Sequence, residues 1–270
     1  EQRIVISAGQ IRAPDRSGKQ DIARKNGLLR VLHKDHVPAR VTGREARFEC
    51  QRANLDGLAR HFCEFDLIGL QESDAASLRS GFLHQTRYLA EAAGMPYWSH
   101  QANRRVSRLA QSANGLLSRL APSEVIDYPL PGRIPGRGAL FARFGQGNEA
   151  LVVVVAHLSL GPQARARQLG FIAELLDDHP HAVLMGDLNC TVDSAEMRQL
   201  FAQTRLIAPP EPAPTFPSWR PRRAIDHILV SAPLQIERLW TLPQVPSDHL
   251  PIAAHVRLPA GALSPQAAAA

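Results

Sequence analysis

Three segments that lie far apart in the sequence place acidic and amide side chains directly after short apolar runs. Residues 184–189 read Leu-Met-Gly-Asp-Leu-Asn, residues 70–72 read Leu-Gln-Glu, and residues 247–249 read Ser-Asp-His. Such apolar runs are typical of buried strands, and strand ends are rigid positions beside loops that admit a substrate. One Glu, two Asp, one Asn and one His placed in this way suit a Mg²⁺-assisted attack of water on a phosphate ester.

The spacing of apolar residues predicts the helices and strands that carry these segments. A helical repeat runs from a predicted N-cap at Asn54 to Phe65. Buried strands over residues 66–70 and 182–185 would end just before the Glu and the Asp of two of the segments. Further helices are expected at residues 78–93, 161–176 and 194–203, and further strands at 3–7, 115–118, 123–127, 138–144, 149–157, 224–230, 235–242 and 252–257.

This order of elements predicts an α/β fold. Helices cluster with the strands that carry the carboxylates, whereas antiparallel strand signals fill the middle of the chain. Two packed mixed β-sheets with helices on both outer faces, a four-layer sandwich, bury this set best. We expect one domain over residues 1–258 and a disordered, Ala- and Pro-rich tail over residues 259–270.

Composition narrows the class of protein. The chain has 270 residues and is 44% hydrophobic, yet it has no apolar run of about eighteen residues that would cross a membrane. Three cysteines without metal-ligand spacing favour inert thiols in a reducing, cytoplasmic compartment. The first residues show neither a start Met nor a signal pattern, which leaves open a leader peptide that was trimmed away.

The net charge of +6 is concentrated in one segment. Residues 12–52 hold eleven Lys and Arg against five Asp and Glu, and the rest of the chain is balanced. We interpret this segment as a basic insertion that draws nucleic acid or an anionic membrane to one face of the protein. The alternative is a solvated loop that is basic without a partner.

Five motifs in order give the chain a resemblance to a known group of proteins. They are Gln71–Glu72, Ala156–Ser159, Gly186–Asn189, Ile225–Ile228 and Ser247–Pro251. Together they resemble the endonuclease/exonuclease/phosphatase superfamily, which has the deoxyribonuclease-I-like fold. The resemblance covers most of the chain and implies a metal-dependent phosphoester hydrolase.

The resemblance also implies a metal site. Glu72 would be a direct ligand of Mg²⁺, with Mn²⁺ as the alternative ion, and Asp248 would bind the ion directly or through water. The first strand of the family usually ends in an Asn that helps to hold metal and phosphate. Residues 7–11 of this chain contain no Asn, and Gln10 is the expected substitute.

The implied catalytic residues fall into two groups. Asp187 would hold the attacking water, and Asn189 would bind the phosphate or position Asp187. His249 would stabilise charge on a phosphate oxygen, and Asp226 would fix the tautomer of His249 and keep it cationic. In the deoxyribonuclease-like branch, a His at the place of His157 contacts phosphate or assists the leaving group, although a buried or turn histidine is the alternative.

Two further residues are expected to bind phosphate. Arg137 lies between glycines before a predicted strand, and Asn114 begins another strand that lines the cleft of the family. A plain turn role is the alternative for both residues.

Residues outside the centre must choose the substrate, because the chemistry needs only a metal, a positioned water and charge stabilisation. One loop combines an aromatic ring that could stack on a base with cations that could contact phosphates, namely Trp219, Arg220, Arg222 and Arg223. The alternative is a packing role for the ring and solvated arginines.

Three functions follow in order of preference. A Mg²⁺-dependent nuclease acting on nucleic acid comes first. A phosphatase or a lipid or inositol-phosphate phosphodiesterase, with an anionic membrane or a phosphorylated lipid as partner, comes second. A binding module that has lost catalysis comes third. The oligomeric state and the choice between endo- and exonuclease action stay open.

Overall fold

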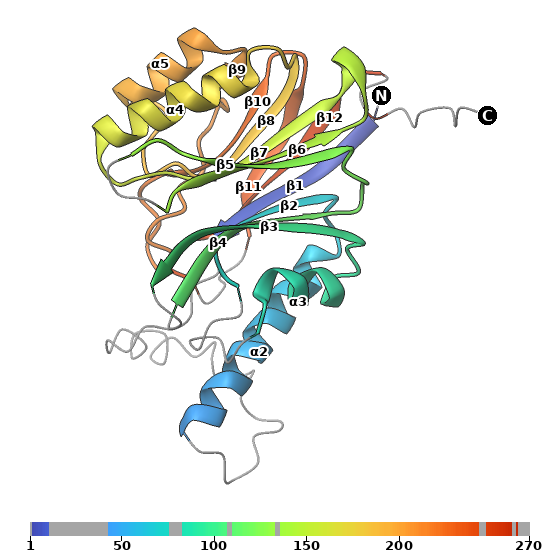
Figure 1. Cartoon of the computed structure of the whole chain (residues 1–270), viewed down its shortest axis with the longest axis vertical. Helices are drawn as coiled ribbons and strands as arrows, with labels where there is room; N and C mark the ends of the chain where they lie inside the picture. The colour runs from blue at the N-terminus through green and yellow to red at the C-terminus, as the bar shows by residue number, and fades with distance from the viewer. Residues whose placement is uncertain are drawn as a thin grey trace, which may run out of the picture.

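The computed structural model describes residues 2–10, 43–75, 83–106, 110–132, 136–242, 247–260 and 263. Within these residues two six-stranded mixed sheets pack face to face, in the strand orders β11-β12-β1-β2-β4-β3 and β5-β6-β7-β8-β10-β9 (Figure 1). The elements are β1 (Gln2–Gln10), α2 (Gly43–Phe62), β2 (Leu67–Asp74), α3 (Gln85–Ala92), β3 (Tyr97–Val106), β4 (Ala110–Ser118), β5 (Glu124–Pro129), β6 (Gly138–Phe144), η3 (Gly147–Glu149), β7 (Leu151–His157), α4 (Pro162–Leu176), β8 (His181–Asp187), α5 (Ala195–Gln203), β9 (Leu206–Ile207), β10 (Asp226–Ser231), β11 (Gln235–Thr241) and β12 (Ile252–Leu258).

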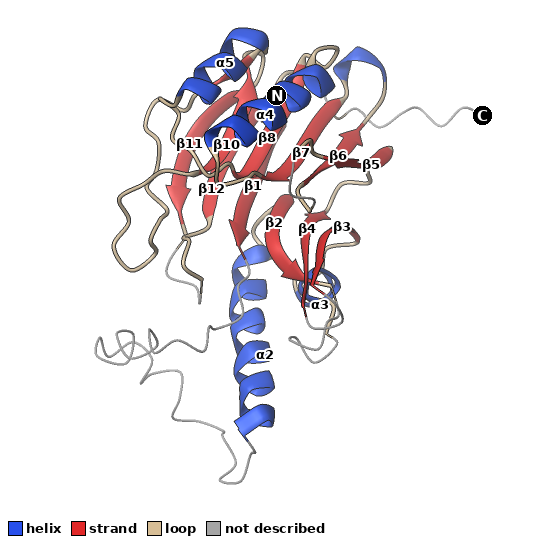
Figure 2. Cartoon of the chain, turned by 60° about the vertical axis from the view of Figure 1, so that its left-hand side comes forward, coloured by secondary structure: helices blue, strands red, loops and turns tan. Residues whose placement is uncertain are grey.

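Three hydrophobic cores separate four layers. The first core lies between the two sheets, the second between α4, α5 and the sheet of β7 and β8, and the third between α2, α3 and the sheet of β1 and β2. The two pairs of helices lie on opposite outer faces (Figure 2). This arrangement confirms the predicted α/β sandwich. Among the described helices, none combines the length and the apolar character needed to cross a membrane.

Strand alternation decides which side chains of β8 face the other sheet. Val183 and Met185 belong to the core between the sheets, whereas Ala182 and Leu184 belong to the core beneath the helices. Because successive side chains of a strand point to opposite faces, Asp187 follows Val183 and Met185 onto the inner face. The same parity places His157 of β7 and Asp226 of β10 on the inner face, because Val155 and Ile228 lie in the inner core.

Two predicted helix starts were wrong. Helix α2 begins at Gly43, eleven residues before the expected cap at Asn54, so part of the segment interpreted as a basic insertion is helical. Its first turns are rich in Arg, Glu and Gln, which are good helix formers but give no apolar repeat. Helix α3 begins at Gln85 rather than at residue 78, with the side chain of His84 accepting a hydrogen bond from the amide of Arg87.

The strand that carries Glu72 is longer than the sequence predicted. Strand β2 continues through Glu72 to Asp74, and its pairing with β4 shifts register between Leu70 and Ser73. Glu72 itself has a φ of 56°, a left-handed conformation that is uncommon outside glycine. Glu72 therefore lies in a β-bulge inside the strand and not after its end. Residues 11–42, 261–262 and 264–270 lie outside the described residues, so most of the basic segment and of the predicted tail stay predictions.

Gly186 allows β8 to approach β7 at the point where both strands end. Its φ is +133°, and a Cβ at this position would lie 2.0 Å from the carbonyl oxygen of Ala156. We expect Gly186→Ala to lower the free energy of unfolding by about 3 kcal/mol or more, because both backbone strain and a clash oppose the methyl group. Urea unfolding monitored by circular dichroism measures this change.

Gly170 is the matched control. It lies inside α4, and a Cβ there meets nothing within 4 Å. Gly170→Ala should stabilise the protein by up to about 1 kcal/mol, because alanine is the better helix former. Equal effects of the two substitutions would contradict the account of Gly186.

Candidate active site

The pairing of three neighbouring strands places three ionisable side chains in line. Asp187 at the end of β8 is the register partner of His157 at the end of β7 and of Asp226 at the start of β10. All three side chains are at least nine-tenths buried. Since parity directs them to the inner face, they meet where the two sheets enclose a common interior.

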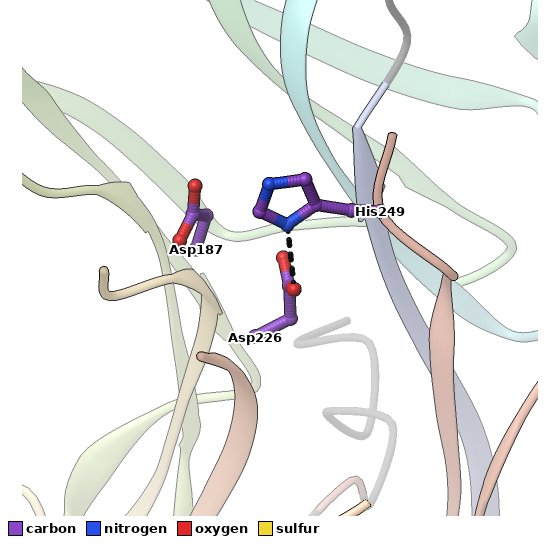
Figure 3. A group of neighbouring side chains, drawn as sticks. All are labelled: Asp187, Asp226 and His249. Atoms are coloured by element: carbon purple, nitrogen blue, oxygen red, sulfur yellow. Dashed lines mark hydrogen bonds and ion pairs between the residues drawn. The ribbon is translucent and has the colours of Figure 1, made fainter. Parts of the chain in front are cut away.

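His249 joins this line from the other sheet. It lies in the loop that leads into β12, and its Nδ1 is 2.7 Å from Oδ2 of Asp226. A carboxylate accepts, so the imidazole carries a proton on Nδ1 and donates it to Asp226. Figure 3 shows Asp187 beside this pair, and one ligand atom from each of Asp187, Asp226 and His249 lies within 4.8 Å of the others.

Asp187 is held by donors from the chain that follows it. The backbone amide of Asn189 donates to Oδ1 of Asp187 at 2.9 Å, and the side-chain amide of Asn189 donates to Oδ2 at 3.3 Å. Nε2 of His157 lies 3.3 Å from the same Oδ2. Asn189 has a φ of 55°, so the backbone accepts an uncommon conformation at the residue that directs both amide groups toward Asp187.

Burial and the neighbouring Asp226 carboxylate together raise the pKa of Asp187 to about 7. His249, the amide of Asn189 and the charge of Arg137 act in the opposite direction. A carboxyl group that ionises near neutral pH is suited to accept a proton from water.

The pKa of His249 is raised, although burial alone would lower it. The hydrogen bond and the charge of Asp226, together with the charges of Asp187 and Asp248, outweigh burial. His249 therefore favours the cationic form, which can donate a hydrogen bond to an anionic oxygen.

Thr215 completes the surroundings of Asp226, and sequence reasoning missed it. The fully buried hydroxyl of Thr215 donates to Oδ2 of Asp226, the oxygen that also binds His249. Thr215 lies in a proline-rich segment without strand or helix periodicity, so no pattern pointed to it.

The loop after Thr215 is bonded to the loop that carries His249. The amide of Ser218 donates to the carbonyl of Asp248 at 2.8 Å, and its hydroxyl donates to the carbonyl of Ser247 at 2.6 Å. The amide of Leu250 donates to the carbonyl of Thr215 at 2.9 Å. The two loops are thus fixed to each other on both sides of His249.

His227 is a second residue that sequence reasoning did not single out. Its Nε2 donates to the carbonyl of Cys190 at 2.8 Å, and burial lowers the pKa of the ring, so it stays neutral. This bond ties the residue after Asn189 to β10 and supports the turn that holds Asp187.

The donor set fits a divalent cation. Asp187 and Asp226 offer carboxylate oxygens, the ligands that Mg²⁺ prefers. Oδ1 of Asp226 is buried and has no hydrogen-bond partner, which a cation would satisfy. The adjacent bulge at Glu72 belongs to the other sheet, and Gln71 beside it approaches Gly186, so Glu72 lies at the same end of the sandwich.

The remaining predicted residues lie at different depths. Asn114 is fully buried and its side-chain amide donates to the carbonyl of Gly138 at 2.8 Å and to Oε1 of Gln101 at 3.2 Å, so it joins the two sheets.

Asp248 is half-buried beside His249, and the backbone of Gln10 pairs with that of Gln71. The side chain of Gln10 lies outside the described part of the chain. Exposed side chains form the predicted substrate loop: Trp219, Arg220, Arg222 and Arg223.

Comparison with known families identifies the class of protein that has this fold and site. Residues 17–249 match the model of the Endonuclease/Exonuclease/phosphatase family. Because the match covers more than half of the chain, this protein belongs to that family, whose members are generally phosphoester hydrolases. No curated protein matched the sequence.

Solved structures share the fold at low sequence identity. A family member from Beutenbergia cavernae is 19% identical with a TM-score of 0.69, covering 96% of this chain and 72% of that one. A mannosyl-6-phosphatase from Bacteroides thetaiotaomicron is 18% identical with a TM-score of 0.65, covering 94% and 100%. TDP2 from D. rerio, in complex with a single-strand DNA product, is 15% identical with a TM-score of 0.61, covering 95% and 100%.

Asp226 should control the titration of His249. We expect Asp226→Asn to lower the pKa of His249, because the hydrogen bond and the charge are lost while burial remains. An NMR titration of the ring in EDTA measures the pKa. Asp248→Asn is the matched control and should lower it less, since Asp248 contributes only a weaker charge effect. An unchanged pKa in Asp226→Asn would show that another group sets it.

Asp187 should destabilise the fold at high pH. Its proton leaves the unfolded chain near pH 3.8 and the folded chain near pH 7, so stability is lost as the pH rises between these values and stays lower above them. Asp187→Asn removes this titration. In EDTA, the free energy of unfolding of Asp187→Asn minus that of the wild type should therefore be larger at pH 8 than at pH 4.5, by about 2–4 kcal/mol.

Urea unfolding at the two pH values provides the measurement. Asp193→Asn is the control, because the exposed Asp193 has a lowered pKa and is ionised at both values. If the difference in free energy of unfolding between Asp187→Asn and the wild type did not depend on pH, Asp187 would be ionised in the folded protein well below pH 7.

Proposed function

We propose that this protein is a Mg²⁺-dependent phosphodiesterase that hydrolyses nucleic acid. The observation that carries the proposal is the buried cluster of Asp187, Asp226 and His249, in which one carboxyl group ionises near neutral pH and one imidazole favours its cationic form. A base and an acidic hydrogen-bond donor within a few ångströms are what an in-line attack of water on phosphorus requires.

The chain supplies the proton transfer and the charge stabilisation. Asp187, oriented by Asn189, accepts a proton from the attacking water. The water oxygen bonds to phosphorus as the ester P–O bond breaks, and the leaving oxygen takes its proton from solvent. His249, oriented by Asp226, donates to a non-bridging phosphate oxygen as its charge grows. His157, whose Nε2 lies 3.3 Å from Oδ2 of Asp187, and Arg137, whose positive charge acts on Asp187, are assigned to phosphate contact.

A divalent cation would be held between the two sheets. Glu72, Asp248 and Gln10 are the proposed ligands. When bound, Mg²⁺ would neutralise charge on the phosphate oxygens. The left-handed backbone at Glu72 supports its assignment, because uncommon conformations cluster at functional sites.

The loop of residues 215–223 supports nucleic acid as the substrate. Trp219 exposes 54% of its surface, and Arg220, Arg222 and Arg223 are exposed around it. An exposed indole beside guanidinium groups can stack on a base while the cations contact the backbone phosphates. Because Ser218 binds the loop of Asp248, the residue that precedes Trp219 is fixed to the loop that carries His249.

The similar structures leave two substrate classes to compare. TDP2 was crystallised with a single-strand DNA product, and the Bacteroides protein is described as a mannosyl-6-phosphatase. Sugar phosphates, inositol phosphates and phospholipid head groups are therefore the alternatives to nucleic acid.

Hydrolysis of labelled single- and double-stranded DNA in Mg²⁺ tests the proposal. We expect cleavage that EDTA abolishes and that Asp187→Asn reduces by at least about 10²-fold in kcat, because the base is lost. Asp193→Asn, which alters an exposed carboxylate, should cleave like the wild type. Mannose 6-phosphate, inositol phosphates and phospholipid vesicles are the parallel substrates. Cleavage of one of these without cleavage of DNA would overturn the choice of nucleic acid.

Trp219 should contribute to substrate binding. Trp219→Ala is expected to raise KM for single-stranded DNA by about 5- to 100-fold, the range expected for one stacked base. Ile207→Ala is the matched control, because Ile207 is an exposed apolar residue on β9 outside the substrate loop. Steady-state kinetics measure both. A Trp219→Ala variant with an unchanged KM would assign Trp219 to packing.

A further inference from the structure

A buried ion pair lies outside the catalytic cluster. Arg165 of α4 contacts Oε1 of Glu196 in the first turn of α5, through Nε at 2.7 Å and Nη2 at 2.6 Å. Both side chains are about nine-tenths buried, so the charges have little solvent to compensate them. An ion pair in such a place seldom improves stability over an apolar pair, which raises the question of what else it does.

Arg165 has a second group of contacts. Its Nη1 donates to the carbonyl of Leu160 and lies 3.5 Å from that of Ser159. Gln168, one turn further along α4 and fully buried, accepts the amide of Ser159 at 2.9 Å and donates to its hydroxyl at 3.0 Å. Two side chains of α4 therefore bind the backbone of the loop that follows His157.

The loop depends on these polar contacts for its position. Leu158 is buried, but the side chain of Leu160 is 76% exposed and gives the loop no apolar anchor at that end. The guanidinium group of Arg165 is planar, and Glu196 binds one of its edges while the loop carbonyls bind another. Glu196 therefore fixes the orientation in which Arg165 binds the loop.

The same loop holds the residues of the cluster. The carbonyl of Leu158 accepts the side-chain amide of Asn189 at 2.9 Å, and the amide of Leu158 donates to the carbonyl of Asp187 at 2.9 Å. The amide group that Asn189 presents to Asp187 is thus bound on its other side to this loop. A series of contacts therefore runs from Glu196 to Arg165, from Arg165 to the backbone of residues 159–160, and from Leu158 of the same loop to Asn189.

We propose that Arg165, oriented by Glu196 and assisted by Gln168, is a positioning residue that fixes residues 158–160 and thereby sets the orientation of the Asn189 amide toward Asp187. The inference rests on the proposed function for its kinetic consequence, but its structural consequence is independent of any substrate.

The test compares three variants of the full chain. Arg165→Met with Glu196→Leu removes the ion pair without leaving a buried charge alone. Arg165→Lys keeps the charge but has a single ammonium group in place of the planar fork. Gln168→Met keeps the Arg165 contacts and removes those of Gln168, which are the two with Ser159 and a hydrogen bond from Nε2 to the carbonyl of Pro131 at 3.2 Å. Arg257→Met is the matched control, because Arg257 binds Glu237 at 2.6 Å between β11 and β12, away from this loop.

Two measurements separate positioning from a purely structural role. We expect kcat for DNA hydrolysis to fall about tenfold in the double variant with KM within about twofold of the wild type, and Arg165→Lys to recover part of the loss. Without substrate, NMR of the Asn189 side-chain amide should show hydrogen exchange about tenfold faster in the double variant and in Gln168→Met.

Unchanged Asn189 signals and unchanged kcat in a folded double variant would overturn the proposal and leave the pair as a link between α4 and α5. If the double variant does not fold, Gln168→Met and Arg165→Lys decide by the same readouts. A wild-type protein that cleaves no DNA would refute the proposed substrate, whereas the Asn189 signals would still decide the positioning role.

Discussion

The register of β7, β8 and β10 is the constraint on which the site depends. It places His157, Asp187 and Asp226 in one row on the inner face of a sheet, and the second sheet closes over them and contributes His249. Two carboxyl groups side by side in a dry interior repel each other and lose hydration, which is why the pKa of Asp187 rises to about 7. The reactivity of the site thus follows from the register of ordinary strand pairing, which brings these ionisable side chains together.

Maintaining this row is costly, and the surrounding contacts offset the cost. Asn189 gives two donors to Asp187, and both His249 and Thr215 bind the same oxygen of Asp226. Asn189 and Glu72 both adopt left-handed backbone conformations beside the cluster. Strain and buried charge concentrated at one end of a sandwich, with apolar cores elsewhere, are typical of a protein that gives up stability for activity.

Much of the fold could be predicted because it rests on apolar periodicity. The run before Asp187 and the Gly-Pro start of α4 correspond to the observed elements, and the motif order led to the family. Local polar structure escaped prediction. The first turns of α2 have helix-forming residues without an apolar repeat. No residue pattern in the sequence indicates the bulge at Glu72. Thr215 and Arg165 act through contacts between distant segments, which no single-sequence pattern contains.

The central claim is that the row of strand-end carboxylates and the facing His249 form one phosphoester-hydrolysing centre around a divalent ion. Anomalous scattering from crystals soaked in Mn²⁺ tests it most directly. The account predicts a manganese peak at the shared end of the two sheets, with a carboxylate oxygen of Glu72 or Asp248 in direct contact with the ion. Manganese bound only at other surfaces, with none near Asp187, would contradict it.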